Sequence, residues 1–218
     1  MALALGEGRG RTAVAGAPAH VTRAVILACV FAFVFQLPPE SFAFVPAYFF
    51  GTVELAGPLP TSALWRGLFG HVLIHGDPVH LLTNMAVLWP LGASVERVVG
   101  HGRFALLFAA GTVAGALTEG ALAADRMAPL VGASGAICAL MGAWLWLRPP
   151  ERSPLRRWLD RTLRVAVALF AALNLAMVVV PPAPDSPLAE VGWGAHVGGL
   201  LAGLLLAPLL RPRRPRRR

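Results

Sequence analysis

The chain has 218 residues, of which 56% are hydrophobic and 14% charged, and its mean hydropathy is +0.65. A soluble domain of this length has too little interior to bury so much apolar surface, so the composition predicts an integral membrane protein built as one domain. The formal net charge is +8, and all 19 basic residues are arginine. Cys29 and Cys138 both lie in apolar runs, which is typical of reduced, packed thiols and not of a disulfide framework.

Apolar runs separated by proline, glycine or charged residues predict six membrane-spanning helices. A helix needs about 20 residues to cross the hydrocarbon core of a bilayer. The predicted spans cover residues 24–37, 79–95, 104–124, 130–147, 165–180 and 191–210. The fourth and sixth are long enough alone, whereas the first is short and is expected to begin before Arg23, whose side chain can reach the membrane surface. The expected fold class is therefore an all-α membrane protein with a six-helix bundle.

The segment between the first two predicted spans, residues 38–78, is unlike a polar linker. It is rich in aromatic residues, namely Phe42, Phe44, Tyr48, Phe49, Phe50, Trp65 and Phe69. Aromatic side chains favour the boundary between membrane and water, so we expect this segment to lie on or partly in the outer leaflet.

The arginines follow the predicted topology. With the N-terminus inside, only Arg66 and Arg126 fall on the outer side, which agrees with the tendency of basic residues to stay in the cytoplasm. The sequence therefore predicts two cytoplasmic termini: a tail at 1–20, a six-span domain at 21–210 and a basic tail at 211–218. Because the basic excess tracks topology, we expect the last tail to lie near anionic lipid and not to bind nucleic acid.

Polar side chains inside the predicted spans are costly and therefore informative. His80 and Asn84 are four residues apart in the second span, which places both on one face of a helix. A hydrogen bond that joins two helices would explain such a pair without any catalytic role. Asn174 is the polar residue of the fifth span; the sequence assigns it no role beyond packing.

Ser134 and His196 lie in the fourth and sixth spans, each beside small residues. Gly199 and Gly203 follow His196 on nearly the same helical face, and a matching face of the fourth span carries Gly135, Ala139 and Gly142. Helices with such faces approach closely. Packing alone would explain the glycines, but it would also bring the hydroxyl and the imidazole onto one seam.

The second, fourth and sixth spans run in the same direction, and each carries its polar residue near the outer end. His80, Ser134 and His196 are therefore expected at one depth, within about two turns of the outer surface. A serine hydroxyl becomes a good nucleophile when a base accepts its proton, and His196 is the candidate base. Attack on an amide creates an oxyanion, for which His80, Asn84 and the backbone N–H of Ser134 are candidate donors.

These motifs together resemble the rhomboid family of intramembrane serine proteases, over about residues 21–210. "GASG" is similar to the family's G-x-S-G, which includes Gly132 and Gly135 and implies Ser134 as nucleophile. "GAHVGGLLAG" is similar to A-H-x-x-G-x-x-x-G and implies His196 as general base. "HGDPVHLLTNM" is similar to H-x-x-x-x-H-x-x-x-N, which implies His80 and Asn84 as oxyanion-site residues and His75 as a structural residue.

Two weaker matches accompany these motifs, and one residue departs from the pattern. Trp65-Arg66 resembles a W-R pair of the first outer loop, and "GASVERVVG" resembles the turn after the second span, with structural roles for Glu96 and Arg97. Many family members carry a tyrosine on the imidazole, four residues after the nucleophile, where this chain has Cys138. His71 is expected either to touch the site or to be a surface residue.

The sequence therefore predicts a serine endopeptidase that uses a Ser134–His196 dyad and cleaves transmembrane segments of other membrane proteins near the outer face. Neither a metal nor a cofactor is expected. A catalytically silent scaffold of the same fold would need a broken dyad, and a transporter would favour ionisable groups near the midplane. The absence of lysine and of an organelle-targeting segment favours a bacterial plasma membrane. The sequence leaves the oligomeric state open.

Overall fold

The protein is mainly helical in the residues that the computed structural model describes, which are 18–52, 60–123, 125–147, 154–183 and 185–210. Within these ranges, the β-type pairing is an isolated bridge between Phe44 and Leu130. The all-α class predicted from the sequence is confirmed. The elements are α1 (His20–Val34), α2 (Pro39–Phe42), α3 (Pro46–Phe49), α4 (Thr61–Gly70), η1 (His71–Leu73), α5 (Pro78–Val99), α6 (His101–Leu122), α7 (Ser134–Trp146), α8 (Pro154–Val179), η2 (Pro187–Glu190) and α9 (Trp193–Leu210).

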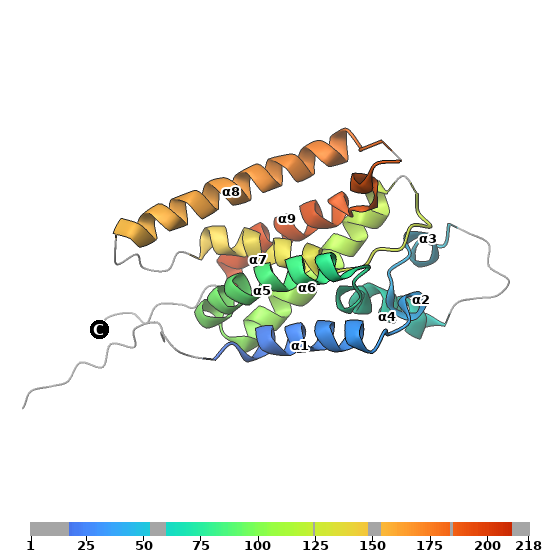
Figure 1. Cartoon of the computed structure of the whole chain (residues 1–218), viewed down its shortest axis with the longest axis horizontal. Helices are drawn as coiled ribbons and strands as arrows, with labels where there is room; N and C mark the ends of the chain where they lie inside the picture. Colours follow the sequence, from blue (N-terminus) through green and yellow to red (C-terminus); the bar gives the residue numbers. More distant parts are fainter. Residues whose placement is uncertain (1–17, 53–59, 124, 148–153, 184, 211–218) are drawn as a thin grey trace, which may run out of the picture.

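Helix α7 is the centre of the bundle. It packs against α9, α6 and α5, while α1 packs on α5, and α8 lies outside α9 (Figure 1). Eight of the 13 residues of α7 are buried, and most of them are small. Small side chains let neighbouring backbones approach, which is how helices gain packing energy where lipid supplies no hydrophobic driving force between them.

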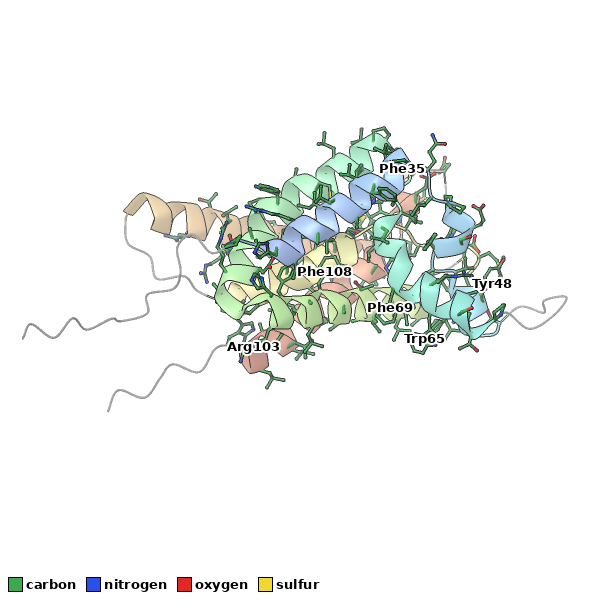
Figure 2. All side chains as sticks on the ribbon, turned by 90° about the horizontal axis from the view of Figure 1, so that it is seen from below. Phe35, Tyr48, Trp65, Phe69, Arg103 and Phe108 are labelled. Carbon is green, nitrogen blue, oxygen red and sulfur yellow. The ribbon has the colours of Figure 1, made fainter. Side chains whose placement is uncertain are left out.

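The aromatic segment that precedes α5 folds into short helices at one end of the bundle. Helices α2, α3 and α4 lie together there, beside the ends of α1 and α6 (Figure 1). Trp65 and Phe69 of α4 stack with their ring centroids 6.0 Å apart and are largely exposed (Figure 2). Phe44, in contrast, is buried at the inner side of this cluster.

Helix α1 is joined to the bundle through Glu96, near the end of α5. Its carboxylate, which is 1% exposed, accepts hydrogen bonds from the backbone N–H groups of Val21 and Thr22 and from the Thr22 hydroxyl, at 2.9, 2.8 and 2.6 Å. His101, at the start of α6, donates to the same carboxylate. One side chain thus fixes the start of α1 against the turn between α5 and α6.

Three helical segments of the described residues are long and apolar enough to cross a bilayer: α6, residues 161–179 of α8, and α9. Helices α1 and α7 are apolar but have only 15 and 13 residues. Helix α5 has 22 residues and carries Glu96 and Arg97 near its end. These helices fit an integral membrane protein.

The helix predicted over 130–147 begins later than expected. Helix α7 starts at Ser134 and is about 20 Å long, because residues 130–133 are extended or bent. Gly132 has φ +106°, which no right-handed helix contains, and Leu130 pairs with Phe44 instead. Other bounds also shift, since α1 begins at His20 and α8 at Pro154. The predicted tails lie outside the described residues except for 18–20.

Replacing Glu96 by alanine should destabilise the protein by about 2–4 kcal/mol, because two buried backbone N–H groups and one hydroxyl of α1 lose a charged acceptor. The measurement is the midpoint of thermal unfolding in detergent. Glu190→Ala, which removes an exposed carboxylate, is the control. Equal midpoints for the two variants would show that Glu96 does not hold α1.

Candidate active site

Ser134 is the first residue of the central helix, and the turn before it sets its position. Gly132 takes a positive φ that an L side chain rarely adopts, and a Cβ there would lie 2.6 Å from His80 Nε2. Glycine is therefore required both for the backbone bend and for the approach of the His80 ring. The bend places the half-buried Ser134 hydroxyl at the N-terminal end of α7, where backbone N–H groups are unpaired.

The segment that leads into Ser134 is held by the aromatic cluster. Leu130 exchanges backbone hydrogen bonds with Phe44, and the N–H of Gly132 donates to the carbonyl of His71 at 2.8 Å. The His71 side chain is 3% exposed and bonds the Gly67 carbonyl, so the expectation of a surface histidine is wrong. Burial lowers the pKa of His71 to about 4, which keeps the ring neutral at physiological pH.

Helix α9 is fixed at its start by a carboxylate from α6. Glu119 Oε2 accepts the N–H of Ala195 at 3.0 Å, directly before His196. A Cβ on Gly194 would lie 2.8 Å from the same oxygen, so the absence of a side chain lets the carboxylate reach the helix end. A negative group at a helix N-terminus is favourable, and here it sets where α9 begins.

The structure brings Ser134 and His196 together. Ser134 Oγ lies 2.8 Å from His196 Nε2, within hydrogen-bond distance. His196 Nδ1, on the other side of the ring, lies 2.6 Å from Asn174 Oδ1 of α8. From the sequence, only a packing role is expected for Asn174, so its contact with His196 was missed. Like Asn84, Asn174 is a single amide in an apolar helix, which is a sign that its side chain has a polar partner. The sequence did not indicate which helix supplies that partner.

The glycine seam between α7 and α9 makes the short Ser134–His196 distance possible. A Cβ on Gly199 would collide with the carbonyl oxygen of Gly135, and one on Gly203 would collide with that of Ala139. On the other helix, a Cβ on Gly142 would collide with the Leu200 carbonyl. The two backbones are therefore in direct contact over two turns.

His80 and Asn84 lie beside the turn that precedes Ser134. Asp77 accepts the N–H groups of Val79 and His80 at 2.7 and 2.9 Å and so caps α5. The backbone N–H of His80 lowers the pKa of the Asp77 carboxyl. The His80 ring rests against Gly132, and Asn84 Nδ2 lies 3.9 Å from the position of a Cβ there. Asn84 Nδ2 donates to the His80 carbonyl at 3.0 Å, and an amide nitrogen carries a second hydrogen.

His75 and Cys138 surround these groups. The His75 ring meets the His80 ring edge-on, with centroids 5.0 Å apart, and burial lowers the pKa of His75 to about 4. Its Nε2 is buried without a partner among the described residues. Cys138 is 2% exposed, and the rings in contact with His196 are instead Phe170 of α8 and Trp193 of α9, at 5.8 and 6.0 Å.

This arrangement suits nucleophilic chemistry without a metal. A hydroxyl faces an imidazole nitrogen, and donors from α5 and from the start of α7 lie on the adjoining side. Within the described ranges, no group of three or more His, Cys, Asp or Glu side chains is placed to hold a metal ion.

Comparison with known proteins gives consistent matches. The sequence profile of the Rhomboid domain matches residues 61–213. The Rhomboid protease GluP of Bacillus subtilis (strain 168) is 27% identical over 146 residues, which are 67% of this chain and 26% of that protein. The Rhomboid protease GlpG of Salmonella choleraesuis (strain SC-B67) is 32% identical over 152 residues, which are 69% of this chain and 50% of that protein. The chain thus spans between a quarter and a half of the length of these relatives.

Gly199→Ala should push α9 away from α7 and separate the hydroxyl from the imidazole. A misplacement of about 1 Å costs about 100-fold in rate, so covalent labelling of Ser134 by a fluorophosphonate should slow by about that factor. The overpacked seam should also lower stability by about 1–3 kcal/mol. Gly102→Ala is the matched control, because a Cβ there meets nothing within 4 Å. Unchanged labelling of Gly199→Ala would show that the seam does not set the site.

Proposed function

The chain belongs to the rhomboid family, and on that basis we propose that it is an intramembrane serine endopeptidase that hydrolyses peptide bonds in transmembrane segments of membrane proteins. The observation that carries the proposal is the 2.8 Å approach of Ser134 Oγ to His196 Nε2. A hydroxyl so placed can transfer its proton to the ring as it attacks an amide carbonyl.

In the proposed reaction, Ser134 Oγ attacks the scissile carbonyl and His196 Nε2 takes the hydroxyl proton. The bond between the carbonyl carbon and the amide nitrogen then breaks, and the protonated ring donates its proton to the leaving amine. Water, deprotonated by the same ring, then attacks the acyl carbon. The ester bond to Ser134 Oγ breaks, and the ring returns the proton to Oγ. Asn84, His80 and the backbone N–H of Ser134 stabilise the negative oxygen that forms at each attack.

We propose that six helices cross the membrane: α1, α5, α6, α7, α8 and α9. These are the long helices, which lie roughly along one axis in Figure 1 although α6 is inclined, and three of them contain segments that meet the length and hydropathy requirements on their own. The described arginines support the orientation, because Arg23, Arg97, Arg103, Arg161 and Arg164 gather near one end, whereas Arg66 and Arg126 lie near the other. Basic residues tend to stay in the cytoplasm, so in this proposal both ends of the six-helix domain face the cytoplasm. The absence of lysine is the reason to propose a bacterial plasma membrane.

This orientation places the site near the outer face. His80, Ser134 and His196 occupy the third, first and fourth positions of α5, α7 and α9, at the end opposite the basic cluster. Water can reach that depth from outside. A substrate helix must unwind locally there, because a regular helix keeps its amide groups in internal hydrogen bonds.

The proposal is tested with the purified protein in proteoliposomes that also contain a single-span reporter substrate. Ser134→Ala and His196→Ala should each lower the cleavage rate by at least about 10³-fold, because nucleophile and base act as one unit. Ser94→Ala is the matched control, since Ser94 is exposed on α5 and bonds only its own helix at Pro90. Cleavage that persists in both variants would contradict the dyad, and a folded wild-type protein without cleavage would favour the silent scaffold.

Asn84→Ala should raise the barrier to cleavage by about 2–4 kcal/mol, mainly through kcat, because a donor to the oxyanion acts in the transition state. Thr83→Ala, the neighbouring residue with a hydrogen bond inside the same helix, should leave kcat unchanged. If kcat is the same in both variants, Asn84 serves only the structure of α5.

A further inference from the structure

Building on the proposed function, we propose that Asn174 of α8 is a positioning residue that fixes the tautomer and the ring orientation of His196. Asn174 Oδ1 lies 2.6 Å from His196 Nδ1, on the side of the ring opposite Ser134. The three side chains come from three helices and form a continuous chain of hydrogen bonds across α8, α9 and α7.

The burial pattern of α8 points to Asn174 first. Among residues 161–179, Asn174 is the only one whose side chain is fully buried, at 1% exposure. The other residues of this stretch are partly or fully exposed and mostly apolar, and α8 packs mainly on α9. An amide inside an apolar environment is costly unless it is hydrogen-bonded, so the partners of this buried amide indicate its role.

The hydrogen bonds of Asn174 determine which way its amide faces. Asn174 Nδ2 donates to the carbonyl of Phe170, one turn earlier in α8, at 2.6 Å. The reversed amide would place Oδ1 against that carbonyl oxygen, and two acceptors would face each other. The amide therefore presents its oxygen to His196, and an amide oxygen only accepts.

It follows that His196 Nδ1 carries the hydrogen and donates it to Asn174. A neutral imidazole has one N–H, so Nε2 then has a free lone pair, and this is the atom that faces Ser134 Oγ. The hydroxyl donates to Nε2, which is the arrangement that proton transfer requires. Without Asn174, either tautomer can form, and the alternative one places an N–H against the Ser134 hydroxyl.

Among the residues that the structure describes, no second acceptor bonds Nδ1 of the ring. Phe170 and Trp193 contact its faces and edge without bonding Nδ1. From α7, the side chain one turn beyond Ser134 is Cys138, which is small and buried. Among the described contacts, the hydrogen bond from Nδ1 to Asn174 of α8 is therefore the one that sets the orientation of the imidazole.

The experiment compares wild type, Asn174→Leu and Asn174→Asp as full chains in proteoliposomes. It measures kcat and KM for the reporter substrate and the rate of fluorophosphonate labelling across pH. Leucine has the same number and branching of side-chain heavy atoms as asparagine but accepts no hydrogen bond, so kcat and labelling should both fall by about 10- to 1,000-fold with KM nearly unchanged. Leu173→Ala, at an exposed neighbouring position, controls for disturbance of α8 and should leave both unchanged.

Aspartate keeps the acceptor, so Asn174→Asp should recover most of the activity that Asn174→Leu loses. Its negative charge stabilises the protonated ring, and the acidic limb of the pH–rate profile should move to higher pH by about one unit. The titratable groups around His196, namely His80 of α5 and Glu119 of α6, are the same in every variant. A purely structural Asn174 would not shift this limb.

Each outcome has a separate meaning. If wild type cleaves and Asn174→Leu cleaves with the same kcat, the inference fails while the proposed function stands. If Asn174→Asp shows no recovery and no shift of the acidic limb, Asn174 only docks α8 on α9. If wild type neither cleaves the reporter nor reacts with the fluorophosphonate, the proposed function fails, and the inference fails with it.

Discussion

The site depends on the direct contact between the backbones of α7 and α9. Gly199 and Gly203 lie against the carbonyl groups of Gly135 and Ala139, so α9 has no room for a Cβ at these points. Serine is a short side chain, and its hydroxyl reaches the imidazole at 2.8 Å only if the two helix axes are close. In a membrane, such closeness is also what stabilises the pair, because small residues maximise van der Waals contact. The same glycines therefore serve both the packing of α7 on α9 and the approach of the Ser134 hydroxyl to His196.

Polar groups at the helix ends fix the positions of the side chains of the site more closely than the contact between α7 and α9 alone. Asp77 caps α5 and sets the position of His80, and Glu119 binds the N–H of Ala195 and sets the start of α9. The carbonyl of His71 holds Gly132 and so the turn before Ser134. Each of these bonds satisfies a backbone group, and those made by Glu119 and by the His71 carbonyl lie inside the bundle, where an unpaired group would be costly. Because the groups are already in place, the proposed oxyanion site needs little rearrangement during reaction.

The sequence predicted those parts of the structure that depend on local pattern. The apolar runs located the long helices, and the glycine spacing in the fourth and sixth spans indicated which faces meet. What it could not predict was set by partners distant in the chain. The run 130–147 is uniformly apolar, and only the pairing of Leu130 with Phe44 and the bend at Gly132 delay the helix to Ser134. The partner of Asn174 is 22 residues away, on a separate helix that no periodicity assigns to it.

Asn84 and Asn174 show how an apolar bundle can use an amide inside a helix. In both, Nδ2 donates to the carbonyl four residues earlier, at 3.0 and 2.6 Å. An amide anchored in this way loses its rotational freedom, and its remaining groups point in a fixed direction. At Asn174 the oxygen faces the Nδ1 of His196, where an acceptor is needed. At Asn84 the second N–H lies on the side of Gly132, where the proposed oxyanion needs a donor. The same kind of local hydrogen bond thus leaves a free acceptor at Asn174 and a free donor at Asn84. Neither asparagine adds a charge to the interior of the membrane.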